Sequence, residues 1–292
     1  SSSTWGAGAI KQGTGANLLF TIYSAHLVPL ATHAEAPRFG SCCKFLVCPP
    51  RTRHRMAGKA QAVINTAELP VMIFSAGFGT RMRHLTQDCP KPLIKVAGQT
   101  LLDRTIALCR DAGVTKMVTN THYLASMITN HLAGQPVEVL HESPDILDTG
   151  GGLKNAATAL GHEVVGTINP DAVWCGPNPI ALLARNWDPS KMDALLACVH
   201  IDQVHGRVGG GDFQVEPDNR ILRSGDYVYG GAQILKMEAV TSMKDTVFSL
   251  NAVWNRLGAE NRLYAEKIPG QWCDVGSPEG LALAEDLIAR NV

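Results

Sequence analysis

The feature that most constrains the fold is a short apolar run that leads directly into a glycine-rich turn. Val-Met-Ile-Phe-Ser over residues 71–75 is followed by Ala-Gly-Phe-Gly-Thr-Arg over residues 76–81. An apolar run of this length that ends in glycine is typical of a strand buried in a sheet. Glycine allows unusual φ angles and close approach of backbone N–H groups, which together bind anions. The turn therefore predicts phosphate binding by Ala76, Gly77, Gly79 and Thr80.

Predicted strands and helices alternate after this turn. The spacing of apolar residues predicts strands over 116–120, 137–140 and 164–168 and helices over 101–109 and 125–132. Such alternation indicates βαβ units and a largely parallel sheet. Three later apolar runs, over 194–199, 213–215 and 227–235, lie closer together and favour a mixed sheet, and an amphipathic helix over 278–289 closes the chain.

Residues 1–55 differ from the rest, with one acid against six Lys or Arg and a run of Ser at the start. Three interpretations remain open: a transit peptide, a secretory leader, or upstream sequence translated in error with Met56 as the true start. The third is favoured. In each case we expect a disordered or non-native leader over 1–55 and a single domain over 56–292.

Overall composition argues against several classes of protein. Lys and Arg total 26 and Asp and Glu total 26, so no excess positive charge indicates nucleic-acid binding. No apolar run reaches the ~18 residues of a membrane span. The eight cysteines show no metal-type pairing, which favours reduced thiols in a cytoplasmic protein. The sequence does not indicate an oligomeric state.

Two basic residues follow the glycine turn, Arg81 and the Lys91 of Pro-Lys-Pro-Leu. An Arg inside a phosphate turn and a Lys held between prolines are suited to neutralising a polyphosphate. A dinucleotide-binding loop is the alternative, and it favours a nicotinamide-dependent oxidoreductase. That fingerprint needs a third glycine, where this chain has Met82.

These segments resemble the N-terminal signature of the sugar nucleotidyltransferase family: Ala-Gly-Phe-Gly-Thr-Arg-Met at 76–82, Leu-Thr at 85–86 and Pro-Lys-Pro at 90–92. The resemblance covers residues 71 to about 290. It implies a three-layer α/β/α sandwich with a mixed, mainly parallel, Rossmann-like sheet. It also implies the joining of a nucleoside triphosphate to a sugar 1-phosphate with release of pyrophosphate. Two residues depart from the pattern: Ser75 replaces Ala, and His84 replaces Pro and could loosen the loop.

Further site residues follow from the same resemblance. Asp171, after the strand over 164–168, and Asp274, in Trp-Cys-Asp-Val-Gly, resemble the family's Mg²⁺ ligands. Taken alone, each Asp could equally cap a helix or a turn. Arg81 and Lys91 take catalytic roles, with Arg81 on the leaving phosphates. The family also implies nucleotide contacts at Gly150 and Gly151, with an ordinary helix entrance as the alternative, and sugar contacts at Asn169, Asp212 and Gly230.

Within the family, the chain is most similar to the N-acetylmuramate-1-phosphate uridylyltransferases. That similarity implies UTP and N-acetylmuramic acid 1-phosphate as substrates, in the recycling of peptidoglycan sugars. Arg207 and the glycines at 209–211 could receive the extra carboxylate of this sugar, or could form a flexible loop. Mannose 1-phosphate with GTP, glucose 1-phosphate with UTP or dTTP, and a non-catalytic regulatory relative are the alternatives.

Overall fold

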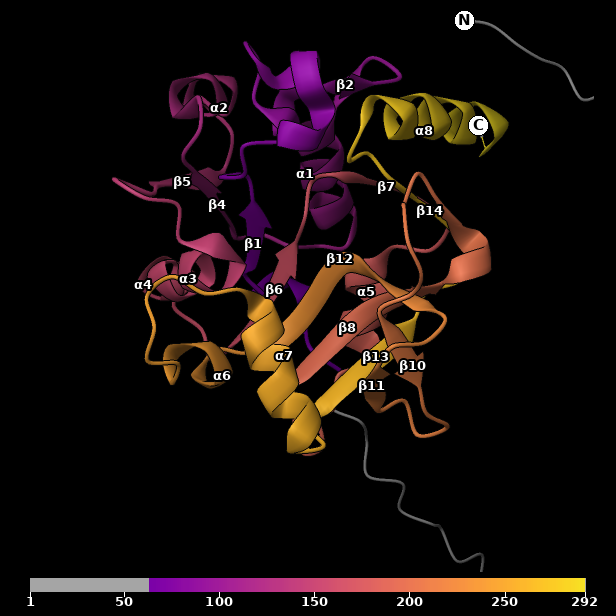
Figure 1. Cartoon of the computed structure of the whole chain (residues 1–292). Coiled ribbons are helices and arrows are strands. Elements are labelled where there is room, and N and C mark those ends of the chain that lie inside the picture. The colour runs from indigo at the N-terminus through magenta and orange to yellow at the C-terminus, as the bar shows by residue number, and fades with distance from the viewer. Residues whose placement is uncertain (1–62, 292) are drawn as a thin grey trace, which may run out of the picture. The chain divides into compact units, whose positions relative to one another are not determined.

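The computed structural model describes residues 63–291, which belong to one compact unit (Figure 1). The expectations for residues 1–55 lie outside this part. None of the helices within it is both long and apolar enough to cross a membrane. The strands are β1 (Val71–Phe74), β2 (Lys95–Val96), β3 (Gln99–Thr100), β4 (Met117–Thr121), β5 (Val137–His141), β6 (Val164–Ile168), β7 (Ala172–Cys175), β8 (Ala194–His200), β9 (Val204–His205), β10 (Phe213–Val215), β11 (Ile221–Arg223), β12 (Tyr227–Lys236), β13 (Leu263–Lys267) and β14 (Gln271–Asp274). The helices are α1 (Leu101–Asp111), α2 (Ala125–His131), α3 (Asp148–Asn155), α4 (Ala157–Leu160), α5 (Pro179–Asn186), α6 (Glu238–Thr241), α7 (Leu250–Ala259) and α8 (Pro278–Asn291).

The large sheet is mixed, with a parallel centre. Strands β6, β1, β4 and β5 lie side by side and run parallel, and β8 runs parallel to β13. The long strand β12 joins the two groups by antiparallel pairing with both β6 and β8. Hairpin β10–β11 pairs with the beginning of β12. The predicted mixed, mainly parallel α/β sheet is confirmed.

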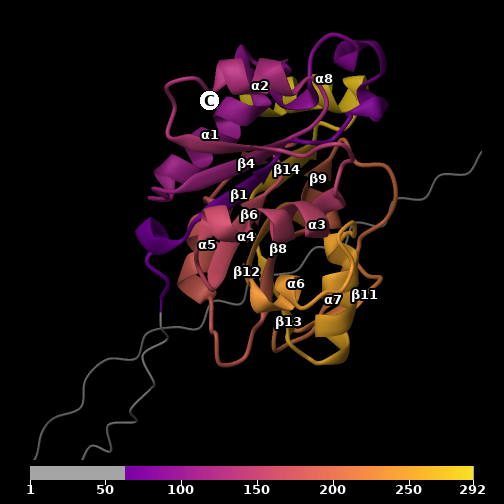
Figure 2. The same ribbon diagram turned by 90° about the vertical axis from the view of Figure 1, so that its left-hand side faces the viewer.

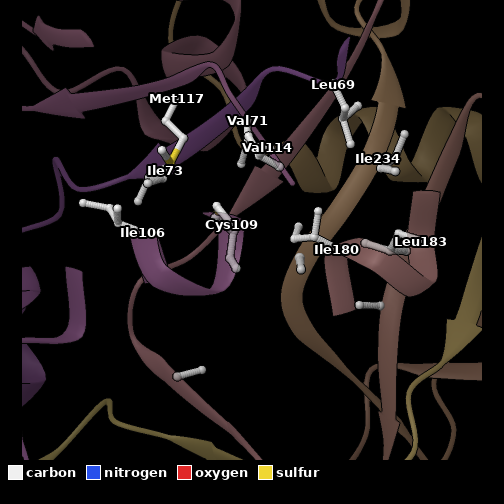
Figure 3. Packing of buried hydrophobic residues seen from close by; sticks show 14 of the residues in the cluster. Leu69, Val71, Ile73, Ile106, Cys109, Val114, Met117, Ile180, Leu183 and Ile234 are labelled. Carbon is white, nitrogen blue, oxygen red and sulfur yellow. The ribbon is translucent and has the colours of Figure 1, made fainter. Parts of the chain in front are cut away.

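Helices cover both faces of this sheet, as the side chains of β1 illustrate. Val71 and Ile73 pack into a cluster with α1 and α5, which Figure 3 shows, whereas Met72 between them packs into a second cluster with α3, α4, α6 and α7. In Figure 2, α1 and α5 lie to one side of the strands and α3, α6 and α7 to the other. Burial of each such side chain contributes about 1.5–3 kcal/mol, which explains the continuous apolar run in the sequence.

A smaller sheet ties the glycine turn to the C-terminal part of the chain. Strand β14 pairs antiparallel with β7 and parallel with β9, and α8 packs against it. The third apolar cluster brings together Met82, Val173, Val275 and Leu287 from the turn, β7, the chain after β14, and α8. Met82, which stands where a dinucleotide loop would have glycine, is fully buried there. It therefore anchors the turn beside β14.

Candidate active site

The glycine turn packs directly onto the segment that carries Lys91. Gly79 has a φ of 64°, in the left-handed region that favours glycine. A Cβ at Gly79 would lie 2.9 Å from Cβ of Lys91 and 3.0 Å from Cγ2 of Thr86, so no side chain fits. The Thr86 hydroxyl donates to the Gly79 carbonyl at 3.1 Å. In contrast, among residues 63–291 no atom beyond Gly77 and its two chain neighbours lies within 4 Å of the Cβ position at Gly77, which leaves this part of the turn open to a ligand.

A buried polar network supports the turn from behind. The Ser75 N–H donates to Oδ1 of Asn120 at 2.9 Å, and the Asn120 amide donates to Oε1 of Glu142 at 2.7 Å. The other Glu142 oxygen accepts the Leu147 N–H at 2.9 Å. Ser75 Oγ lies 2.9 Å from Oγ1 of Thr119, so the residue that departs from the family pattern fits a polar neighbourhood. Asn120 also lines the cleft, which the sequence did not indicate.

The structure brings Arg81, Lys91, Asp171 and Asp274 together at the end of the central strands. Lys91 Nζ lies 2.8 Å from Oδ2 of Asp171, and Arg81 Nη1 lies 3.5 Å from Oδ2 of Asp274. The Lys91 side chain is 11% exposed, while that of Arg81 is 68% exposed. Lys91 is therefore held in place, whereas Arg81 has room to change partners.

Pairing of β7 with β14 sets the distance between the two carboxylates. Asp274 is the cross-strand partner of Ala172, the residue that follows Asp171. The Val275 N–H then donates to the backbone carbonyl of Asp171 at 2.9 Å. A Cβ at Gly276 would lie 2.7 Å from Arg81 Nη1 and 2.8 Å from Asp274 Oδ1. Glycine at this position is what lets the Arg81 guanidinium lie beside Asp274.

The charges of this group shift the acidities of its two carboxyls in opposite directions. Burial by itself raises the pKa of Asp171, but Lys91 and Arg81 outweigh burial and hold it below its usual range. Burial is also the largest influence on Asp274. The negative charge of Asp171 adds to it, so the pKa of Asp274 is raised despite Lys91 and Arg81. The two carboxylates therefore repel each other across the site.

The four charged residues lie where two cavities of about 310 Å³ each adjoin. The first cavity is bounded by the glycine turn and by the ends of β1, β4 and β6, and the second by the C-terminal strands and α7. Their common lining marks the junction of one continuous cleft and consists of Arg81, Asp148, Thr149, Asn169 and Asp171. Ala76, Gly77, Gly79, Thr80 and Lys91 line the first cavity.

The residues predicted to contact sugar, Asn169, Asp212 and Gly230, all line the second cavity. Asp212 is fully engaged by the protein: Oδ1 lies 2.6 Å from Nη2 of Arg207, and Oδ2 accepts the Tyr229 N–H at 2.9 Å. A Cβ at Gly230 would collide with the indole ring of Trp174. Asp212 and Gly230 therefore shape the wall of this cavity.

Three further residues singled out in the sequence have partners within the protein. The N–H groups of Gly150 and Gly151 both donate to the Phe248 carbonyl, at 2.9 and 3.0 Å, and neither glycine lines the cleft. These N–H groups are thus not available to a nucleobase, and the glycines instead allow α3 to pack closely against the loop before α7. Likewise Arg207, expected to receive a substrate carboxylate or to be solvated, is paired with Asp212.

Comparisons with known proteins agree with this geometry. Residues 71–215 match the family described as "MobA-like NTP transferase domain". N-acetylmuramate alpha-1-phosphate uridylyltransferase from Caulobacter vibrioides is 34% identical over 233 residues, which cover 75% of this chain and 96% of that protein. The chain belongs to the sugar-1-phosphate nucleotidyltransferase family. The protein of the same name from Neisseria meningitidis is 29% identical over 219 residues, covering 72% of this nucleotidyltransferase and 94% of the relative.

Solved structures support the fold of this nucleotidyltransferase. The inositol-1-phosphate CTP transferase from T. maritima superimposes with a TM-score of 0.65 at 16% identity, over 79% of this chain and 97% of that one. The matched family region ends at Val215 and therefore includes Lys91 and Asp171 but not Asp274.

Among residues 63–291 no group of three or more Cys, His, Asp or Glu side chains could hold a metal ion. The five described cysteines are free thiols, and Cys109, Cys198 and Cys273 are buried.

Proposed function

We propose that this nucleotidyltransferase transfers the uridylyl group of UTP to N-acetylmuramic acid 1-phosphate with Mg²⁺, releasing pyrophosphate, in the recycling of cell-wall sugars. The observation that carries the reaction class is the pairing of Lys91 with Asp171 and of Arg81 with Asp274 at the junction of two cavities. The choice of UTP and this sugar is supported by similarity to the two uridylyltransferases.

Asp171 and Asp274 are the residues that would hold Mg²⁺. Their mutual repulsion, which contributes to the raised pKa of Asp274, would be relieved by a divalent cation. Mg²⁺ is usually bound by one or two carboxylates, with water and substrate phosphates completing its shell. A pair of carboxylates beside a phosphate turn fits this preference. When bound, the ion would neutralise phosphate charge.

The nucleophile in this proposal needs no general base. A phosphate monoester has a second pKa of about 6, so the sugar phosphate is already ionised at neutral pH. Its oxygen attacks the α-phosphorus of UTP, and the bond from that phosphorus to the pyrophosphate oxygen breaks. Catalysis then consists of alignment and stabilisation of charge.

In this proposal, the residues that line the cleft have separate roles in aligning the substrates. The N–H groups of the turn around Gly77 would bind triphosphate oxygens, since that turn is open to ligand. Arg81, exposed and only weakly paired, would turn from Asp274 to the β- and γ-phosphates. Lys91, fixed by Asp171, would stabilise charge on the α-phosphate. Asn169, at the junction of the cavities, would orient the sugar phosphate.

A matrix of substrates tests the proposal. Release of pyrophosphate is measured for UTP, GTP, CTP and dTTP, each against the 1-phosphates of N-acetylmuramic acid, N-acetylglucosamine, glucose and mannose. UTP with N-acetylmuramic acid 1-phosphate should give the highest kcat/KM. If mannose 1-phosphate with GTP or glucose 1-phosphate is best, the substrate assignment is wrong. Absence of turnover for every pair would instead favour a regulatory relative that only binds nucleotide sugars.

A further inference from the structure

Three arginines line the second cavity, and they differ in whether a carboxylate neutralises them. Arg81 pairs with Asp274, and Arg207 pairs with Asp212. Arg223, which the sequence did not single out, forms no ion pair with any residue of the described chain. Of the three, Arg223 therefore has no direct ion-pair partner among the described residues, although the charge of Asp212 acts on it from farther away.

The guanidinium of Arg223 is nevertheless held in a fixed place. Nε donates to Oδ1 of Asn255 at 3.0 Å, and Nη2 donates to the backbone carbonyl of Asn251 at 3.3 Å. The guanidinium carbon lies 4.9 Å from the centre of the Phe213 ring and 5.7 Å from that of Trp254. All these partners are neutral. Nη1 donates to no atom of the described residues, so part of the guanidinium fork is unused.

The position of Arg223 follows from the hairpin of β10 and β11. Arg223 is the direct cross-strand partner of Phe213, so both side chains lie on the same face of the hairpin, and both contact the ring of Trp254 on α7. Partial burial lowers the pKa of Arg223, although the charge of Asp212 opposes this shift. An arginine remains charged in proteins. Arg223 is exposed on the cavity wall, where its guanidinium can bind an anionic ligand through charge-assisted hydrogen bonds.

We propose that Arg223 recognises a carboxylate on the sugar, so that the enzyme selects sugar 1-phosphates that carry a second anionic group. This inference rests on the proposed function, in which the sugar carries a lactyl ether with a carboxylate. Arg207 is a weaker candidate, because Asp212 at 2.6 Å already neutralises its charge. The free Nη1 donors and the aromatic walls give Arg223 both the charge and the apolar contacts that a lactyl group requires.

Substitution of Arg223 tests the assignment, with two substrates that differ only in the lactyl group. For Arg223→Gln, kcat/KM with N-acetylmuramic acid 1-phosphate should fall by roughly 30-fold or more, mainly through KM, because a charged hydrogen-bond partner is lost. With N-acetylglucosamine 1-phosphate the change should stay within about twofold, since no carboxylate is present. Arg223→Lys keeps the charge without the fork and should retain part of the preference.

Arg220→Gln is the matched control, because Arg220 precedes the same hairpin strand and pairs with the exposed Asp218 instead of lining the cavity. Arg220→Gln should leave kcat/KM unchanged for both sugar phosphates. Equal losses for both sugars in Arg223→Gln, with a lower Tm, would show that Arg223 only secures the hairpin to α7. If the unmodified enzyme prefers the carboxylated sugar and Arg223→Gln keeps that preference, only the role of Arg223 is wrong. If the unmodified enzyme prefers a neutral sugar phosphate, the proposed substrate fails as well.

Discussion

The two ends of the cleft are built from different kinds of contact. We call the part of the cleft beside the glycine turn the phosphate end. Its ion pairs join residues far apart in sequence: Lys91 with Asp171, 80 residues away, and Arg81 with Asp274, 193 residues away. We call the second cavity the sugar end. There, Arg207 pairs with Asp212, only five residues away. The first set forms only when the whole domain folds, whereas the second stabilises one loop. In the proposed function, charge at the phosphate end should govern turnover, whereas contacts at the sugar end should govern the shape of the cavity.

Removal of charge at the phosphate end should have the largest effect. Asp171→Asn keeps the size of the side chain but removes the anionic partner of Lys91 and, in the proposed function, a negative charge that would hold Mg²⁺. We expect kcat to fall by roughly a hundredfold or more, with little change in fold by circular dichroism. Asp218→Asn, at an exposed ion pair, is the control and should be neutral. Near-normal turnover of Asp171→Asn at saturating Mg²⁺ would contradict the metal assignment.

Substitution of Arg81 and of Lys91 should both lower kcat, but the two variants should differ in their other properties. Arg81→Ala and Lys91→Ala should each lower kcat by roughly tenfold to a hundredfold. Arg81→Ala should also weaken the binding of UTP, because a bidentate contact to phosphate is lost. Lys91→Ala should also lower the Tm, since it leaves the half-buried Asp171 without its partner. Calorimetric titration with UTP distinguishes the two, and unchanged UTP affinity in Arg81→Ala would contradict its role.

A methyl group at the sugar end should act through packing. In Gly230→Ala the new Cβ would collide with the Trp174 ring, which should lower the free energy of unfolding by about 1–3 kcal/mol. KM for the sugar should rise more than KM for UTP, because the cavity wall moves. Gly210→Ala is the matched control, since no atom of the described residues beyond its chain neighbours lies within 4 Å of the Cβ position there. Equal free energies of unfolding for the two variants in urea would show that the Trp174 ring can move aside without loss of stability.

An ion-pair group outside the cleft shows the effect on stability that removal of a carboxylate has when no role in catalysis is involved. Asp193 contacts Arg262 at 2.8 Å and Lys236 at 2.7 Å. The hydrogen bond from Arg262 is the main reason that its pKa is lowered; burial opposes the shift, and Lys236 adds to it. We expect Asp193→Asn to lower the free energy of unfolding by about 1 kcal/mol at pH 7, without changing kcat.

The pH dependence of that loss follows from linkage. A depressed pKa in the folded state stabilises the protein above the ordinary Asp value near 4, and this contribution disappears as the pH falls through the folded-state pKa. Urea denaturation at pH 7 and pH 3 should therefore show a smaller difference between Asp193→Asn and the unmodified protein at pH 3. A difference that grows with acidification would contradict the sign of this shift.

The sequence indicated the glycine turn and Lys91 because one contiguous motif carries them. The strand over residues 71–75, the turn and Lys91 lie within 21 residues, and their chemistry needs no knowledge of distant partners. Contacts with remote partners left no sign in the sequence: the N–H groups of Gly150 and Gly151 donate to Phe248, almost 100 residues later. The pairing of Arg207 with Asp212 was also not foreseen, although the two residues lie only five positions apart.

The residues that the sequence missed lie mostly around α7. This helix could have been recognised from Leu250, Val253, Trp254 and Leu257, which have helical spacing after the N-cap Ser249. Its role as a wall of the sugar cavity could not, because that depends on how hairpin β10–β11 packs against it. Arg223 becomes notable only once its neutral neighbours are known.

Isotope transfer most directly tests the central claim that a sugar phosphate oxygen forms the new bond to the α-phosphorus of UTP. N-acetylmuramic acid 1-phosphate labelled with 18O in its non-bridging phosphate oxygens is incubated with unlabelled UTP, Mg²⁺ and the enzyme, and the products are followed by 31P NMR. If a sugar phosphate oxygen attacks the α-phosphorus of UTP, all the label remains in the nucleotide sugar, with one labelled oxygen bridging its two phosphorus atoms. Pyrophosphate then carries none. Label in pyrophosphate, or an unlabelled bridge in the nucleotide sugar, would contradict the account.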